Sequence, residues 1–281
     1  LAAGSHPGTA AMLAFLTVAA FEAVAGLPRA GALAGHAATA AARVVEAAEG
    51  PVPVPEPAAP AAPPKGSSLK FEAVRFRWQP DRALVLDGLT LDIPQGARVA
   101  VLGPSGAGKS TLAALALKVA APQEGRVLLG GTDIATLAAA DVRGRIAWLS
   151  QATHLFDDTI RANLAAEPDL WAALESARVA EVVRALPEGL DTYVGEAGGR
   201  FSGGQGRRLA LARALLSTAP VLILDEPCAG LDAETERDFF TTLNTAAEGR
   251  TILLIAHRLT GAERLDRIWR LSAGRAVAAA G

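Results

Sequence analysis

The sequence has very little cysteine and no excess of charge of either sign. Cys228 is the only cysteine among 281 residues, so no disulfide can form within the chain and a cysteine-based metal cluster is excluded. This usage suits a reducing compartment. The 27 basic and 29 acidic residues give a net charge of −2. Because that balance provides no overall field to hold nucleic acid, we expect no nucleic-acid partner.

No internal repeat is visible, and the length allows one large domain or two smaller ones with a sizeable core. Alanine dominates the composition and raises the apolar fraction to 51% without supplying bulky core side chains. The residue types of each segment therefore indicate more than the overall hydrophobicity does.

The chain begins with a long apolar stretch. Ala10–Leu27 contains one charged residue, Glu22, and its length is close to the ~20 residues that cross a bilayer core. A signal peptide and an alanine-rich helix of a soluble protein are the alternatives. The signal peptide is disfavoured because a basic N-terminal region and a cleavage site are missing. Glu22 and its small neighbours favour a membrane helix packed in a bundle. Leu1 in place of methionine indicates a chain cut from a longer one.

A boundary follows this helical region. Helix-forming residues continue through Arg29–Glu49 and end at Gly50. Pro51–Pro64 then holds seven prolines in fourteen residues, which is typical of a stiff, extended spacer. We therefore expect a helical part over residues 1–50, a proline-rich linker over residues 51–68 and a separate domain over residues 69–281.

The third part alternates short apolar runs with helical stretches. Strands are predicted at Leu69–Phe76, Leu84–Ile93, Ala97–Leu102, Arg126–Leu129, Ile146–Leu149, Val221–Leu224 and Thr251–Ile255. Helices are predicted from Ser110 to about Ala120 and over Leu170–Leu186, Gln205–Ser217 and Ala233–Ala246. This alternation indicates an α/β fold with a mainly parallel sheet covered on both faces.

A glycine-rich run lies between the predicted strand Ala97–Leu102 and the helix that follows. It consists of Gly103, Pro104, Ser105, Gly106, Ala107, Gly108, Lys109, Ser110 and Thr111, and it fits G-x-x-x-x-G-K-[ST]. Its glycines allow backbone N–H groups to surround phosphates, and the helix start adds its positive end. We expect Lys109 to reach the β- and γ-phosphates of ATP and the Ser110 hydroxyl to bind Mg²⁺. A turn without a ligand is the alternative, and the strand-to-helix context argues against it.

Two carboxylates follow the apolar strand Val221–Leu224. A nucleotide site needs one acid that holds Mg²⁺ through water and one that orients the attacking water. We assign the first role to Asp225 and the second to Glu226. Such a pair is common by chance, and it gains weight here from the glycine-rich run earlier in the chain.

A further motif, Phe201 to Gln205, precedes a basic helix. Ser202, Gly203, Gly204 and Gln205 offer a hydroxyl and open N–H groups to an anion, and an ordinary helix N-cap is the alternative. FSGGQ followed by LALARAL resembles the signature of ABC ATPases, which other P-loop families lack. The resemblance covers Leu69 to about Gly274. It implies a P-loop ABC-type ATPase with a β-subdomain and a helical signature subdomain, preceded by the end of a helical transmembrane domain.

The same resemblance assigns roles to three more residues. Trp78 resembles the aromatic residue that stacks on adenine, although a surface tryptophan is the alternative. Gln151 resembles the Q-loop glutamine, which touches Mg²⁺ and communicates with the membrane part. His257 resembles the switch histidine that contacts the γ-phosphate. Ala229–Asp232 is similar to the D-loop, which crosses the interface between two such domains.

The resemblance extends to exporters. Thr192–Gly198 is similar to a segment of ABC exporters in which Glu196 would face the intracellular loops. Phrases such as AHRLTGAERLDRIWRL resemble the CydC subunits of CydDC-type exporters. That implies ATP-driven export of thiols or haem-related cargo in cytochrome bd assembly and a CydD-like half-transporter as head-to-tail partner. It also implies an inner-membrane location with a cytoplasmic ATPase domain. A homodimeric multidrug- or lipid-type exporter and a non-transport ABC ATPase are the alternatives.

The sequence departs from the family pattern in three ways. Phe201 stands where leucine is usual, Cys228 stands where serine or threonine is usual, and five of the six expected membrane helices are absent. Phe201 keeps an apolar contact. We expect Cys228 to be a small packed residue rather than a redox group, because an unactivated thiol is inert.

Overall fold

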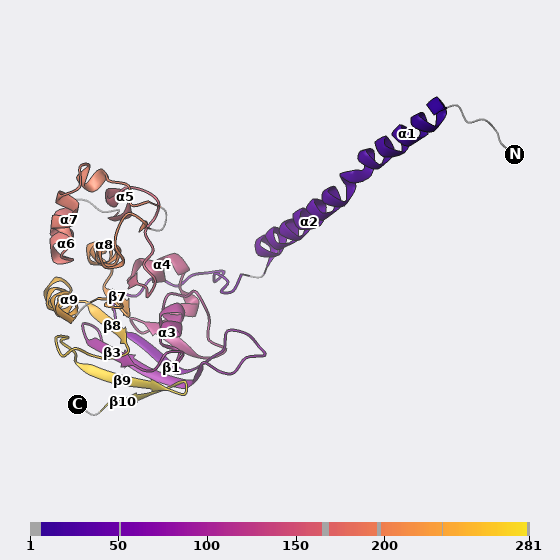
Figure 1. The fold of residues 1–281 in the computed structure, drawn as a ribbon. Coiled ribbons are helices and arrows are strands. Elements are labelled where there is room, and N and C mark those ends of the chain that lie inside the picture. Colours follow the sequence, from indigo (N-terminus) through magenta and orange to yellow (C-terminus); the bar gives the residue numbers. More distant parts are fainter. Residues whose placement is uncertain (1–6, 51, 165–168, 196–197, 232, 280–281) are drawn as a thin grey trace. The chain divides into compact units, whose positions relative to one another are not determined.

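The computed structural model describes residues 7–50, 52–164, 169–195, 198–231 and 233–279 (Figure 1). Its contacts divide the chain into two compact units, Leu1–Val52 and Pro53–Gly281. Each unit is described by itself below.

The first unit is helical. It contains α1 (Pro7–Ala25) and α2 (Leu27–Glu49), and a proline in the first turn of α2 suits that helix start because its missing N–H needs no partner there. The described part of the unit has one helical stretch, Gly8–Glu49, that is long and apolar enough to cross a membrane. The criterion is length and composition alone, which a signal sequence near the N-terminus also meets.

The proline-rich segment from Pro53 onward belongs to the second unit. The Glu56 carboxylate accepts hydrogen bonds from the Ala139 N–H at 3.0 and 3.2 Å, and the Ala61 N–H donates to the Thr136 carbonyl at 2.8 Å. The Arg145 guanidinium donates to the Gly66 carbonyl at 3.0 Å. The segment is free of helix and strand, as its prolines dictate, and it is tied to the domain at several points.

Two sheets form the second unit (Figure 1). The larger has the order β10-β9-β3-β8-β7-β6 and comprises β3 (Arg98–Leu102), β6 (Ile146–Leu149), β7 (Val221–Asp225), β8 (Thr251–Ala256), β9 (Arg267–Ser272) and β10 (Arg275–Ala278). All its pairings are parallel except that of β9 with β10. The smaller sheet is antiparallel, with the order β2-β1-β4-β5, and comprises β1 (Leu69–Phe76), β2 (Leu86–Ile93), β4 (Glu124–Leu129) and β5 (Thr132–Asp133).

The helices of this unit cover the sheets. They are α3 (Lys109–Ala116), α4 (Ala139–Gly144), α5 (Ile160–Leu164), α6 (Leu170–Ser176), α7 (Ala180–Arg184), α8 (Gly203–Leu216) and α9 (Ala233–Ala246), with short 3₁₀ turns at Ile134–Thr136 and Gly189–Asp191. Figure 1 shows α5, α6, α7 and α8 gathered into one helical group. The predicted α/β fold with a mainly parallel sheet, a β-subdomain and a helical subdomain is therefore confirmed.

The apolar pattern of the central strands explains the core. Every residue of β7 and β8 is buried, as expected for central parallel strands covered on both faces. Alternate residues of these strands point into two different clusters. Ile223 and Leu253 pack with the antiparallel sheet and α3, whereas Leu222 and Leu254 pack with α8 and α9.

The single helix predicted over Leu170–Leu186 is wrong in its continuity. The structure has α6 and α7 in its place, separated at Arg178, which takes a positive φ of 55°. A residue in this left-handed conformation ends an α-helix, and the Arg178 N–H closes the last turn by donating to the Glu175 carbonyl.

Candidate functional site

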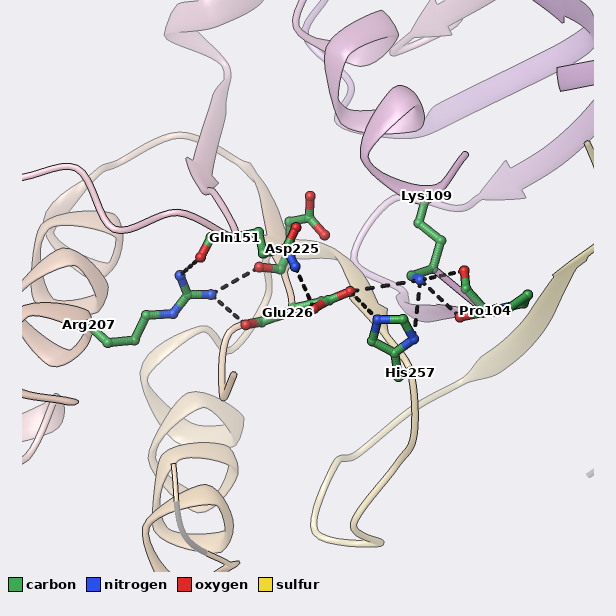
Figure 2. A network of polar contacts seen from close by, with 8 residues as sticks. Pro104, Lys109, Gln151, Arg207, Asp225, Glu226 and His257 are labelled. Atoms are coloured by element: carbon green, nitrogen blue, oxygen red, sulfur yellow. Dashed lines mark hydrogen bonds and ion pairs between the residues drawn. The ribbon is translucent and has the colours of Figure 1, made fainter. Parts of the chain in front are cut away.

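Four of the predicted site segments meet at one edge of the larger sheet. Strands β3, β6, β7 and β8 run parallel, so their carboxyl ends lie at the same edge. The glycine-rich run follows β3, Gln151 follows β6, Glu226 follows β7 and His257 follows β8. In open α/β sheets this edge is where ligands bind. Figure 2 shows Lys109, Gln151, Glu226 and His257 pointing toward one another.

The glycine-rich run needs glycine at two places for steric reasons. Gly108 has φ 96° at the N-cap of α3, and a Cβ there would lie 2.8 Å from Val85 Cγ1. A Cβ on Gly103 would lie 2.6 Å from the Leu271 carbonyl oxygen. Since only glycine satisfies both constraints, the loop can turn tightly and leave its backbone N–H groups open at the start of α3.

Lys109 lies inside this loop with only 5% of its surface exposed. Its Nζ donates to the Gly103 carbonyl at 2.9 Å and to the Pro104 carbonyl at 3.0 Å, and it lies 3.8 Å from Glu226 Oε1. The ammonium group is therefore held against the backbone of the glycine-rich run, close to the Glu226 carboxylate.

Glu226 is the centre of the polar network. Its Oε1 lies 2.7 Å from His257 Nε2, and its Oε2 accepts a hydrogen bond from Gln151 Nε2 at 2.9 Å. The residue has a positive φ of 48°, and its N–H donates to the Ile255 carbonyl at 2.8 Å. Non-glycine residues in this region carry backbone strain that the surrounding structure must offset, and such residues cluster at functional sites.

Asp225 is suited to a cation. Asp225 is 1% exposed, and its buried Oδ1 has no hydrogen-bond partner among the described residues. Burial raises the pKa of the Asp225 carboxyl, and a hydrogen bond from Ser110 opposes that effect. No cluster of three or more histidine, cysteine or acidic ligands exists in the described ranges. One carboxylate and one hydroxyl fit Mg²⁺, which takes few protein ligands and completes its shell with water and phosphate oxygens.

Ser202–Gln205 begin α8 and form a capping box. Ser202 Oγ accepts from the Gln205 N–H at 3.3 Å, and Gln205 Oε1 accepts from the Ser202 N–H at 3.0 Å. Ser202 is therefore the N-cap residue of α8, as the alternative interpretation of this motif predicted. In the part of the chain that the structure describes, no hydrogen bond joins these residues to the glycine-rich run, Asp225 or Glu226.

The remaining predicted positions are dispersed. Trp78 follows β1, is 54% exposed and packs edge-on against Phe76 with ring centroids 4.9 Å apart. Glu196 and Asp232 lie outside the described residues. Cys228 is buried beside Glu226, and burial raises the pKa of its thiol, which disfavours the reactive thiolate.

One buried residue of the site was missed. Arg207 on α8 donates to backbone carbonyls on both segments that carry Gln151 and Glu226 (Figure 2). Its position in the basic run GRRLALARALL carried a weak signal, because Arg207 lies three and four residues before Ala210 and Leu211 and so shares their buried helix face.

The sequence of this chain matches a known protein family. The sequence profile described as "ABC transporter" matches residues 86–229, slightly more than half of the chain. The chain belongs to the ABC transporter family. It carries the ATP-binding ATPase domain of that family, as the signature motif predicted.

Individual relatives are exporters. An "ATP-dependent lipid A-core flippase" of Chromohalobacter salexigens is 46% identical over 215 residues, which cover 74% of this chain and 37% of the relative. An "ATM1-type heavy metal exporter" of Novosphingobium aromaticivorans is 40% identical over 225 residues, covering 78% and 37%. A solved structure, of "a bacterial Atm1-family ABC exporter with ATP bound", matches with a TM-score of 0.78 and 38% identity over 84% of this chain and 42% of that one. The chain thus spans about two fifths of the length of these relatives.

These relatives narrow the exporter assignment. The similarity is to proteins named as a lipid A-core flippase and as Atm1-type exporters, and it does not support the CydC assignment or its heterodimer. The CydC interpretation relied on phrases around motifs that ABC exporters share, so those phrases did not discriminate between subfamilies.

Proposed function

We propose that this chain is the ATPase end of a half-transporter that binds Mg–ATP, hydrolyses it and drives export across the inner membrane. The observation that carries the proposal is the Glu226 carboxylate, held by Gln151 and His257 beside Lys109. Three strand ends bring one carboxylate, one amide and one imidazole to the end of a phosphate-binding loop. These are the functional groups that phosphoryl transfer to water requires.

Each residue has a part in the reaction. Lys109 exchanges its contacts with Gly103 and Pro104 for phosphate oxygens. Glu226 orients the attacking water and accepts its proton, and His257 contacts the γ-phosphate. Ser110, Asp225 and Gln151 would hold Mg²⁺, which when bound neutralises charge on the phosphate oxygens. Trp78, exposed after β1, supplies a ring for adenine to stack on.

We further propose that the site is completed by a second ATPase domain in a head-to-tail dimer. Ser202–Gln205 of each domain would face the nucleotide held by the other. Two features support this role: the first-turn N–H groups of Gly203 and Gly204, which the capping box does not use, and the exposure of Ser202. The cytoplasmic ATPase domain would connect through the proline-rich segment to a membrane domain that ends with α1 and α2.

For the cargo, we propose an amphipathic lipid. Seven relatives of this chain are named as lipid A-core flippases, and their identity to it reaches 46%. Thiol or haem-related cargo with a CydD-like partner is the second candidate, and it rests on the phrase resemblance alone.

The test uses the full-length protein in proteoliposomes. Glu226→Gln should abolish ATP hydrolysis while ATP binding stays within about twofold, because the amide keeps the shape but accepts no proton. Glu188→Gln, the same change at an exposed position, is the control. ATP-driven flipping of a labelled lipid should be present in the control and lost with Glu226→Gln. Full hydrolysis in Glu226→Gln would overturn the assignment, and export of glutathione without lipid flipping would favour the second cargo.

A further inference from the structure

Arg207 is a buried cation that has no part in the proposed mechanism of ATP hydrolysis. It lies in the second turn of α8 and is 3% exposed. In the described part of the chain its five hydrogen bonds all go to backbone carbonyls. Figure 2 shows those to Gln151, Asp225 and Glu226. Nε donates to Pro227 at 2.9 Å, Nη1 donates to Ser150 and Gln151 at 2.6 Å each, and Nη2 donates to Asp225 at 3.0 Å and to Glu226.

The carbonyl groups that accept these hydrogen bonds belong to two segments, and each segment carries a predicted catalytic residue. One segment, Ser150 and Gln151, follows β6, and the other, Asp225 to Pro227, begins at the last residue of β7. The two are far apart in the sequence and carry the amide and the carboxylate that meet at 2.9 Å. A single planar guanidinium therefore lies between the backbones of both catalytic segments.

This arrangement has an energetic cost that points to a specific role. Burial lowers the pKa of Arg207, because the charged form is removed from water. The charge is met by neutral carbonyls rather than by a paired carboxylate. Only arginine offers five donors in a fixed fork, whereas lysine has three donors on one nitrogen and cannot span both segments.

We propose that Arg207 is a positioning residue that fixes Gln151 relative to Glu226 and couples both to the Ser202 end of α8. The coupling part rests on the proposed function, in which Ser202 faces the nucleotide of the partner domain. Arg207 follows Ser202 by five residues, about 7.5 Å along a rigid helix at 1.5 Å per residue. A shift of the helix start on contact with that nucleotide therefore moves the guanidinium and, through it, both catalytic segments.

A positioning role for Arg207 predicts that its loss lowers the rate of ATP hydrolysis but not the affinity for ATP. The glycine-rich run binds phosphates with its own N–H groups and Lys109, and neither contacts Arg207. Loss of Arg207 should therefore leave ATP affinity within about twofold. The rate constant kcat should fall by about 100-fold, since a displacement of about 1 Å in a catalytic group has an effect of that order.

The experiment compares Arg207→Met and Arg207→Lys with the control Arg208→Met in the full-length protein. Arg208 is the next residue of α8 and donates to the Arg178 carbonyl and to Thr235 Oγ1, away from the catalytic segments. ATP binding, kcat and KM are measured for each variant. Amide hydrogen exchange is followed by mass spectrometry in peptides covering residues 149–155 and 225–231, with a peptide covering residues 69–93 as internal reference.

The expected result is a large fall of kcat with little change of KM in both Arg207 variants. Exchange should become faster in the two catalytic peptides and stay unchanged in the reference peptide, and Arg208→Met should show neither effect. If Arg207→Met does not fold, Arg207→Lys decides. Unchanged kcat in Arg207→Lys, its failure to fold, or equal loosening of all three peptides would overturn the inference. If the unmodified protein hydrolyses no ATP, the proposed function fails, and the exchange measurement still tests the positioning role.

Discussion

His257 Nε2 lies 2.7 Å from Glu226 Oε1, and this contact follows from the pairing of two neighbouring strands. β7 and β8 run parallel with Asp225 beside Ile255, and the Glu226 N–H donates to the Ile255 carbonyl. The residues that leave these strands, Glu226 and His257, therefore emerge side by side. The sheet thus sets the position of the imidazole relative to the carboxylate before any nucleotide binds.

Replacement of His257 by alanine should remove this contact and leave the Glu226 carboxylate with Gln151 and Lys109 as its neighbours. We expect kcat for ATP hydrolysis to fall by about 100-fold, within the usual range for loss of one group that stabilises charge in the transition state, and ATP affinity to stay within about twofold. Steady-state hydrolysis and equilibrium ATP binding measure the two effects. His154→Ala, at an exposed histidine, is the control. Equal kcat in both variants would contradict the role of His257.

Replacement of Lys109 by alanine should act on binding instead. A charge-assisted hydrogen bond contributes about 1.5–3 kcal/mol, so we expect ATP affinity to fall by at least about tenfold. Fluorescence titration with a labelled nucleotide measures the change. Lys70→Ala is the control, because the half-buried Lys70 pairs with Glu72 on β1, away from the glycine-rich run. Nucleotide affinity that survives Lys109→Ala would exclude the phosphate role of this lysine.

Asp225 should make stability depend on pH in a defined direction. Burial raises its pKa above the ordinary 3.8, so the folded state holds the proton more tightly than the unfolded state. The resulting stabilisation is complete below the ordinary pKa and is lost as pH rises through the raised one. Asp225→Asn carries no such titration. Its unfolding temperature relative to the unmodified protein should therefore increase as pH rises from acid to neutral.

Asp191 offers a control with the opposite sign. A hydrogen bond from Arg161 lowers the pKa of Asp191. Its stabilisation is present above the ordinary pKa and is lost as pH falls through the lowered one. Thermal unfolding of Asp225→Asn and Asp191→Asn across the acid range should therefore show trends of opposite direction. Parallel trends would show that the environment of Asp225 is not the one described.

The proline-rich segment should stabilise the ATPase domain through Glu56. Its carboxylate caps the Ala139 N–H and lies 3.9 Å from the ammonium group of Lys118, whose side chain is 2% exposed. We expect Glu56→Ala to lower the free energy of unfolding by about 1 kcal/mol, the usual contribution of one hydrogen bond, with no change in ATP affinity. Urea denaturation measures the first quantity. A stability loss no larger than that of the exposed-site control Glu188→Ala would show that the segment is not held by Glu56.

Local chemistry allowed much of the fold to be predicted. β1 and β6 have the predicted bounds, and α9 does as well, because their apolar patterns have the period of their own secondary structure. Strands β9 and β10 escaped prediction. The β9 residues Arg267 and Arg270 interrupt an apolar run and are exposed. β10 lies at the edge of the sheet with β9 next to it, and exposed charges are tolerated at a sheet edge.

The motifs at Gly103–Thr111, Asp225 with Glu226, and Ser202–Gln205 were determined by the sequence itself, since each depends on neighbouring residues and on the strand or helix that they adjoin. The sequence also determined the family. Only the tertiary structure decided that Gln151 reaches Glu226 across 75 positions of the chain and that Arg207 joins their backbones. These contacts depend on the order of parallel strands and on the packing of α8 against them. Sheet order and packing are properties of distant segments, and no local pattern specifies them.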